Sequence, residues 1–279
     1  MDMTTVIDDT TSGIATNTAA ATATRMPVLF VRRGRGRTGG STLCDWLIQR
    51  ARRNDRRAKA LDGDLRSRTL MELYPSGAGK EAVDPDAASA PPSEALAAVR
   101  TWLLDELNAM AEDRVSRLLD LGGGDRVIQE FVQDLSLVEF TRRFNISLVQ
   151  AFFLGPDEED FRHVVSTIDH AQFDPRRTIL YLNDGVVRTG QTSHGVFEPL
   201  TRHREFMELV RSGIRTVTIP RIICLDEMRG LGLTINDVLR NRPGHSGRRA
   251  PPTMQIMVED WCRRLETAHA NNEIAELLP

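Results

Sequence analysis

The chain has 279 residues, of which 41% are hydrophobic, and a formal net charge of −3 at pH 7. This size and composition provide one full hydrophobic core, with room for a small appendage. The negative charge excludes a protein that attracts nucleic acid over its whole surface. The three cysteines are odd in number and widely spaced, which argues against a disulfide framework and predicts a reducing, cytoplasmic environment.

Membrane association is not expected from this sequence. Apolar runs stay well short of the roughly 20 residues that a spanning helix needs, and the N-terminal residues lack the charged-then-apolar order of a signal peptide. The C-terminal residues 271–279 are acidic, whereas a helix that lies on a membrane surface is usually basic.

In chain order, residues 1–25 are rich in Thr, Ala and Asp and predict a disordered tail. Apolar runs of strand length then alternate with segments of helical spacing. The expected strands are 27–33, 57–62, 114–120, 146–154, 177–183 and 215–219, and the expected helices are 41–53, 93–111, 125–143, 157–171, 198–212 and 226–239. This alternation predicts an α/β fold with a doubly wound, mostly parallel sheet flanked by helices.

Residues 26–240 are therefore predicted to form one α/β domain, interrupted by a proline-rich loop insertion at 75–93. The insertion contains Gly77-Ala78-Gly79-Lys80, which lacks a following Ser or Thr and follows no convincing strand. Residues 241–252 are expected to be a linker, and 253–279 to contain a C-terminal helix.

The most informative motif follows the first predicted strand. Glycines at 34, 36, 39 and 40 lead through Ser41 and Thr42 into a helix, as in a loop that binds phosphates with backbone N–H groups and a helix N-terminus. The pattern G-x-x-x-x-G-K-[ST] fails at one position, because Gly40 stands where lysine is expected. A lysine there neutralises phosphate charge in the transition state, so its absence should reduce catalysis more than binding.

Polar residues follow the other predicted strands. Asp62 and Asp64 follow the second strand, Asp120 the third, Asn183 a later one, and Pro220 the last. Ligands of doubly wound sheets bind at this carboxyl edge. Each aspartate could instead cap a turn, and Asn183 begins an Asn-Asp-Gly sequence that forms turns by itself.

The order of these motifs resembles the ParA/MinD branch of P-loop NTPases, which includes plasmid-partition and conjugation-associated members. Its loop reads G-K-G-G-x-G-K-[ST]-[ST], and the chain aligns with it without a gap. Arg35 then falls on the signature lysine, Gly40 on the second lysine and Ser41 on the magnesium-ligand hydroxyl. The resemblance extends to the D-x-D of Asp62 and Asp64, the Walker B carboxylate of Asp120, the glycines 122 and 123, and Asn183 near the adenine.

The resemblance implies ATP and Mg²⁺ as cofactors. It places phosphates on Gly34, Gly36, Thr38, Gly39, Gly40, Ser41 and Thr42, and the rest of the nucleotide near Asn183 and Pro220. It implies that Ser41, Asp62 and Asp120 hold Mg²⁺, and that Asp64 positions the attacking water. Arg35 would act as an arginine finger across a nucleotide-dependent homodimer, with Arg37 or Arg35 compensating for the missing lysine.

Three functions stay open from the sequence. The first is an ATP-binding switch with slow or absent hydrolysis, acting in plasmid or DNA partition, transfer or protein positioning. The second is a pseudo-ATPase scaffold that serves an unknown protein partner without turnover, and the third is another α/β enzyme, for instance a transferase. If Gly40 occupies the lysine position, Gly40→Lys is expected to speed hydrolysis or tighten binding.

Between residues 32 and 59, ten basic residues stand against two acidic ones. The simpler interpretation is a solvated helix end beside a phosphate loop. The alternative is non-specific DNA binding, with Arg52, Arg53, Arg56 and Arg57 as candidates.

Overall fold

A computed structural model describes residues 25–36, 38–64, 67–74, 82–83, 92–121, 131, 135–168, 174–188 and 190–279. Residues 1–24 of the predicted tail, most of the 75–93 insertion, Arg37, the glycines 122 and 123, and much of the helix predicted at 125–143 lie outside these residues.

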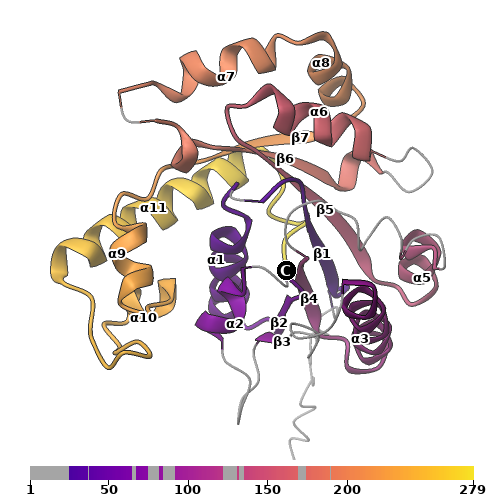
Figure 1. Cartoon of the computed structure of the whole chain (residues 1–279), viewed down its shortest axis with the longest axis horizontal. Coiled ribbons are helices and arrows are strands. Elements are labelled where there is room, and N and C mark those ends of the chain that lie inside the picture. The colour runs from indigo at the N-terminus through magenta and orange to yellow at the C-terminus, as the bar shows by residue number, and fades with distance from the viewer. Residues whose placement is uncertain are drawn as a thin grey trace, which may run out of the picture.

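A seven-stranded sheet with the order β3-β2-β4-β1-β5-β6-β7 forms the centre of the protein, and all of its paired strands are parallel (Figure 1). Its strands are β1 (Val28–Arg33), β2 (Ala58–Asp62), β3 (Ala82–Val83), β4 (Ser116–Asp120), β5 (Ser147–Leu154), β6 (Thr178–Asn183) and β7 (Arg215–Ile219). Six of them confirm the predicted strands to within two residues, and the predicted α/β class is confirmed. Strand β3 lies within the segment that was predicted to be a loop.

One face of the sheet packs against helices from the two ends of the chain. These are α1 (Gly40–Arg53), α2 (Thr69–Leu73), α9 (Leu225–Gly230), α10 (Ile235–Leu239) and α11 (Pro252–Asn271). Phe30, Phe153 and Tyr181 point to this face and join Trp46 of α1 and Trp261 of α11 in one core. The C-terminal helix α11 is thus packed into the same core as α1, the helix that follows the glycine-rich residues 34–39.

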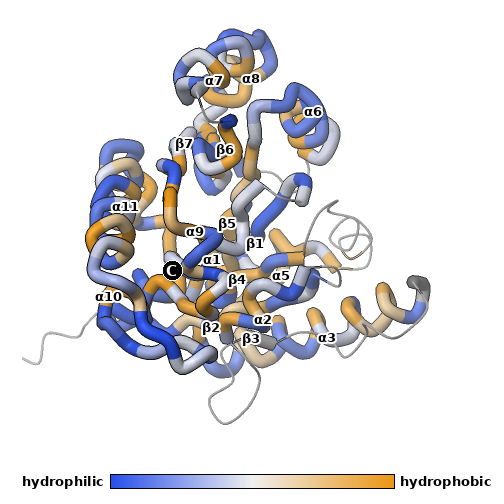
Figure 2. Tube along the Cα trace, turned by 60° about the vertical axis from the view of Figure 1, so that its left-hand side comes forward, coloured by the Kyte–Doolittle hydropathy of each residue, from blue (hydrophilic) through white to orange (hydrophobic). Residues whose placement is uncertain are grey.

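The opposite face of the sheet packs against other helices and forms two further hydrophobic cores with them. These helices are α3 (Pro92–Asp113), α5 (Leu137–Arg143), α6 (Glu158–Thr167), α7 (Ser193–Thr201) and α8 (Arg204–Arg211). Two short 3₁₀ helices, η1 (Pro175–Arg177) and η2 (Asp184–Val186), flank β6. Figure 2 shows hydrophobic and hydrophilic residues alternating along α6, α7 and α8, as expected for helices with one buried side.

Two predicted helices need correction. The segment predicted as one helix at 198–212 forms α7 and α8, which are separated by a break at Arg202–His203, and the segment at 226–239 forms α9 and α10. The second break has a turn chemistry that apolar spacing alone does not reveal. Gly232 adopts a positive φ of 63°, and Thr234 caps α10 in a reciprocal capping box with Asp237.

None of the helices in the described part of the chain is long and apolar enough to span a bilayer. The three cysteines are buried and unpaired to one another.

Candidate functional site

The glycine loop joins the carboxyl end of β1 to helix α1. Gly39 is the N-cap of α1 and adopts a left-handed conformation, with φ of 86°. Among the described residues, no side chain caps this helix and its first turn contains no acidic residue, whereas Ser136 and Thr234 cap α5 and α10. The N-terminus of α1 therefore presents backbone N–H groups and a positive dipole end, which suit an anion.

Asn183 braces this loop from the end of β6. Its side-chain nitrogen donates to the carbonyl oxygen of Thr38 at 2.7 Å, and its side-chain oxygen accepts from the backbone N–H of Gly185 at 2.8 Å. The Asn-Asp-Gly turn and the contact with the loop are thus present together. A Cβ at Gly39 would lie 2.2 Å from the same side-chain nitrogen, so only glycine fits there.

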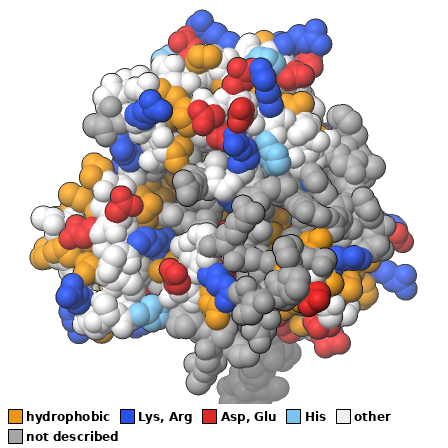
Figure 3. All heavy atoms as spheres, viewed as in Figure 1, with side chains coloured by type: hydrophobic (Ala, Val, Ile, Leu, Met, Phe, Trp, Pro, Cys, Tyr) orange, Lys and Arg blue, Asp and Glu red, His pale blue; other side chains and the backbone are white. Residues whose placement is uncertain are grey.

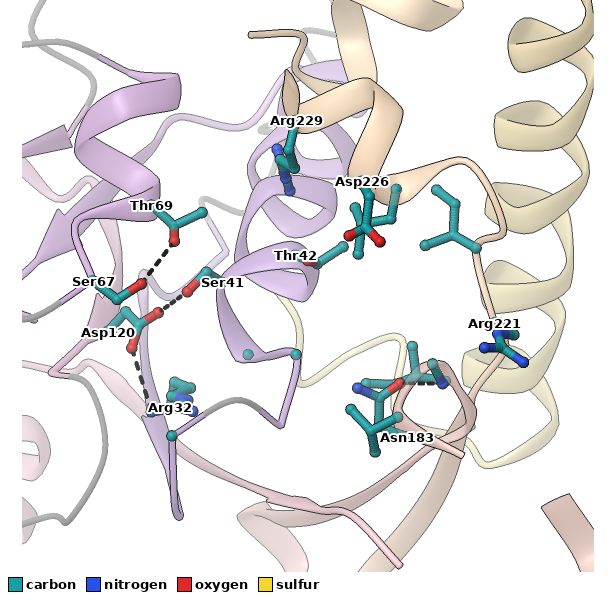
Figure 4. Close-up of a pocket in the computed structure, with 18 of the residues that line it drawn as sticks. Arg32, Ser41, Thr42, Ser67, Thr69, Asp120, Asn183, Arg221, Asp226 and Arg229 are labelled. Atoms are coloured by element: carbon teal, nitrogen blue, oxygen red, sulfur yellow. Dashed lines mark hydrogen bonds and ion pairs between the residues drawn. The ribbon is translucent and has the colours of Figure 1, made fainter. Parts of the chain in front are cut away.

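Ser41 and Asp120 meet at the opening of helix α1. The Ser41 hydroxyl donates to Oδ2 of Asp120 at 2.6 Å, although the two residues lie 79 positions apart in the sequence (Figure 4). Asp120 ends β4, which pairs directly with β1. The structure therefore places two of the three residues for which the resemblance implied metal binding in direct contact, and the third, Asp62, lies beside Asp120 in register on the neighbouring strand β2.

Arg32 is a third member of this group and was not predicted. It pairs in register with Asp120, and its guanidinium lies 3.6 Å from Oδ1 of that residue. It also donates to the carbonyl oxygen of Arg35 at 2.9 Å and to the Thr38 hydroxyl at 3.3 Å. A signal was available in the sequence, because two arginines end a strand that is otherwise apolar, and a charge buried in a parallel sheet needs a partner.

Gly40 lies directly against Arg32. A Cβ at Gly40 would lie 2.2 Å from Nε of Arg32 and 2.8 Å from its Cγ. The expectation that Gly40→Lys alone improves the site is therefore not supported, because the new side chain and Arg32 would compete for the same space.

Asp62 is held differently from Asp120. Its two carboxylate oxygens accept from the backbone N–H groups of Asp64 at 3.2 Å and Met71 at 2.8 Å, which fixes the turn into α2. Burial, and to a lesser degree the neighbouring Asp120, raises the pKa of Asp62 to about 7. Asp64 lines the cavity in front of the loop, where its carboxylate accepts from the N–H of Ser67 at 3.1 Å.

Arg35 also lines the cavity in front of the loop. Its guanidinium pairs with Glu159 at 3.0 Å and Asp160 at 3.4 Å, both on α6, and 43% of its side chain is exposed. In this structure the predicted arginine finger is thus paired within its own chain.

A cavity of about 1060 Å³ opens in front of the glycine loop. One end is lined by Arg32, Gly36, Gly39, Gly40, Ser41, Thr42, Asp64 and Asp120. The other end is lined by Asn183, Ile219, Pro220, Arg221, Ile222, Ile223, Leu225, Asp226, Arg229 and Trp261. The polar end suits phosphates. The other end combines apolar side chains, among them the predicted Pro220, with charged residues such as Arg221 and Asp226 (Figure 4), and its apolar part suits a flat ring.

The donors at the polar end fit a hard cation such as Mg²⁺. Ser41 and Asp120 supply a hydroxyl and a carboxylate oxygen 2.6 Å apart. Within the described residues no group of three or more His, Cys, Asp or Glu forms a metal cage. This donor set matches the usual coordination of Mg²⁺ in proteins, in which one or two protein ligands are completed by water and substrate phosphates.

The arginine-rich residues 50–57 lie at the end of α1 that is remote from the loop, because α1 begins at Gly40 beside the loop and its last turn contains Arg50, Arg52 and Arg53. Two of these arginines already have partners: Arg53 forms an ion pair with Glu266 at 3.4 Å, and Arg56 donates a hydrogen bond to the carbonyl oxygen of Leu278 at 3.3 Å. Among the coloured residues of Figure 3, positive and negative side chains are interspersed over the visible face.

Fold and site together define a parallel α/β protein with a glycine loop between its central strand β1 and helix α1. No family model and no curated protein matches the chain. Among solved structures it is similar to the MinD cell division protein of Aquifex aeolicus, with 12% identity and a TM-score of 0.45, over 86% of this chain and 97% of that one.

Proposed function

We propose that this chain is a nucleotide-binding switch that takes ATP with Mg²⁺ and hydrolyses it slowly or not at all. The observation that carries the proposal is the 2.6 Å hydrogen bond between Ser41 and Asp120 at the N-terminus of α1, beside a cavity of about 1060 Å³. A hydroxyl and a carboxylate at this place are the protein ligands of a magnesium–polyphosphate complex.

In this proposal, the residues of the loop and of the strand ends around it have different roles in binding. Backbone N–H groups of Gly36 and of residues 38–42 would face the phosphates. Ser41 and Asp120 would hold Mg²⁺, which supplies charge neutralisation for the phosphates when it is bound. Asp62 would position the turn that carries Asp64, because both of its oxygens already accept backbone N–H groups. The base would lie between Pro220 and the apolar side chains beside it.

Slow turnover follows from Gly40. Position 40 carries no lysine, and a lysine there would stabilise the negative charge that develops on the transferred phosphoryl group in the transition state. Asp64 lines the cavity and is the proposed residue that positions water.

The motif resemblance described above further suggests that two nucleotide-bound copies pair, with Arg35 exchanging Glu159 and Asp160 for the partner's nucleotide. A role in plasmid or DNA partition, transfer or protein positioning belongs to the same proposal, and so do a protein partner and a cytoplasmic location.

The proposal is tested by thermal unfolding with ATP or ADP, each with Mg²⁺ or with EDTA. A ligand that binds only the folded state raises the melting temperature by mass action. We expect a rise with Mg²⁺ and nucleotide that Ser41→Ala reduces and that the exposed control Ser212→Ala keeps. No rise at millimolar nucleotide would contradict the proposal.

A second candidate is a scaffold that serves a partner without nucleotide. The pairing of Arg32 with Asp120 favours it, because this arrangement already neutralises the carboxylate from within the chain. Absence of a nucleotide-dependent shift in a well-folded protein would support this candidate.

A further inference from the structure

The two arginines that end β1 face opposite sides of the sheet. Arg33 follows Leu29 and Val31 to the α3 side, where it donates to Oε1 of Gln150 at 2.8 Å and lies 5.4 Å from the centre of the Phe152 ring. Arg32 follows Val28 and Phe30 to the α1 side and lines the cavity. Strand alternation thus places one arginine at the site and its neighbour away from it.

Arg32 is almost fully buried, with 4% of its surface exposed. Its guanidinium holds the glycine loop through Arg35 and Thr38 and faces Asp120, whose other oxygen accepts from Ser41 (Figure 4). Removing a cation from water is costly, so a buried arginine at the edge of a polar cavity calls for a strong anionic partner.

Gly40 completes this arrangement. Its missing side chain leaves the space that Arg32 fills, with Nε, Cγ and Cδ of Arg32 at 2.2, 2.8 and 3.0 Å from a Cβ at position 40. A lysine at 40 and an arginine at 32 would therefore exclude each other, although both would bring a cation to the same end of the cavity.

We infer that Arg32 supplies, from strand β1, the phosphate-binding charge that a lysine at position 40 would otherwise supply. The inference rests on the proposed nucleotide site. Without ligand, Arg32 is neutralised by Asp120. When Asp120 binds a divalent cation, Arg32 loses this partner and its planar guanidinium pairs with phosphate oxygens, for which arginine has matching geometry.

The first test is calorimetric titration of MgADP into wild type, Arg32→Ala and Arg33→Ala. ADP is chosen so that turnover does not affect the readout. Arg33→Ala is the matched control, because it removes a buried arginine from the same strand but the opposite face. We expect Arg32→Ala to weaken binding at least about tenfold, as the loss of charge-assisted hydrogen bonds does, and Arg33→Ala to stay within about threefold of wild type.

The second test exchanges the two positions. In Arg32→Ala/Gly40→Lys the space beside residue 40 is open, and we expect the double variant to regain most of the lost affinity. Gly40→Lys alone should bind no better than wild type. Recovery of affinity in the double variant would show that Arg32 acts through its positive charge and not only by holding the loop. A lysine on α1 cannot replace the contacts that Arg32 makes with Arg35 and Thr38.

If Arg32→Ala unfolds at working temperature, the comparison of Arg32→Lys with Arg32→Met replaces it. These variants differ in charge and little in size, and we expect the lysine variant to bind MgADP at least about tenfold more tightly. Equal affinities in this pair, wild-type affinity in Arg32→Ala, or a double variant no better than Arg32→Ala would overturn the inference. A wild type that binds no MgADP would overturn the proposed function as well, whereas binding that ignores Arg32 would overturn this inference alone.

Discussion

The side chain of Asn183 joins the end of β6 to the carbonyl oxygen of Thr38, 145 residues earlier in the chain, at 2.7 Å. This contact fixes the loop in which Gly39 adopts its left-handed conformation. Since the loop must present its N–H groups in one direction to bind phosphates, the brace links the folding of the sheet to the binding site.

Gly39→Ala is therefore expected to abolish nucleotide-dependent stabilisation. The new Cβ would overlap with Asn183 and force the loop away from the phosphates. The control is Gly247→Ala, since Gly247 also has a positive φ, of 74°, but no atom within 4 Å of its Cβ position. Both variants carry the backbone cost of roughly 1–2 kcal/mol, so only their ligand responses should differ in thermal unfolding with MgADP. A wild-type response in Gly39→Ala would show that this glycine does not shape the site.

The positions of the sheet and the loop could be predicted from the sequence, because nearly continuous apolar runs such as 147–154 are typical of strands buried on both faces. The meeting of Ser41 and Asp120 followed from the rule that carboxyl ends of parallel strands share an edge. Arg32 could not be placed in this way, since which of two adjacent arginines faces the cavity depends on strand register. The double contact of Asn183 also depends on tertiary distances that sequence spacing does not contain.

Asp64→Asn is expected to lower the slow release of phosphate from ATP by about 100-fold or more, as the loss of a group that positions or deprotonates water does. ADP affinity should change little, because binding is assigned to the loop. The measurement is phosphate release at saturating ATP, with Asp105→Asn on the exposed side of α3 as the control. Unchanged release in Asp64→Asn would remove Asp64 from the reaction.

The stability of the core into which α11 packs should depend on pH through His269, which lies on that helix. Its ring stacks on Trp46 at 4.8 Å between centroids, and its Nε2 lies 3.0 Å from the Tyr181 hydroxyl. Burial, with a smaller effect from Arg50, lowers the pKa of His269 to about 4. Because the unfolded chain binds this proton near pH 6.5 and the folded chain does not, stability should be lost as the pH falls from about 6.5 to 4.

The loss attributable to His269 should approach ~3 kcal/mol at pH 4. Urea unfolding of wild type and His269→Gln measures it, since the glutamine variant cannot take the proton and the stability difference between them should narrow toward low pH. His194→Gln, at an exposed position, serves as the control and should follow wild type. A constant difference from pH 7 to pH 4 would contradict the neutral, buried state of His269.

The basic end of α1 is tested with DNA. If Arg52, Arg53, Arg56 and Arg57 contact about four phosphates, raising salt from ~50 to ~200 mM should weaken retention in an electrophoretic shift roughly 100-fold through counterion release. Replacing all four by glutamine should abolish retention. The charge-matched control replaces four exposed arginines elsewhere, Arg162, Arg202, Arg204 and Arg263. DNA binding that persists in the first variant, or that ignores salt, would exclude this surface.

The central claim is that the loop between β1 and α1 binds a nucleotide, and titration with a fluorescent ATP analogue, in Mg²⁺ and in EDTA, tests it most directly. We expect saturable binding that is tighter in Mg²⁺, because Ser41 and Asp120 would then hold the cation beside the phosphates. Ser41→Ala should remove most of this advantage. Absence of saturable binding at millimolar concentration in both conditions would contradict the account.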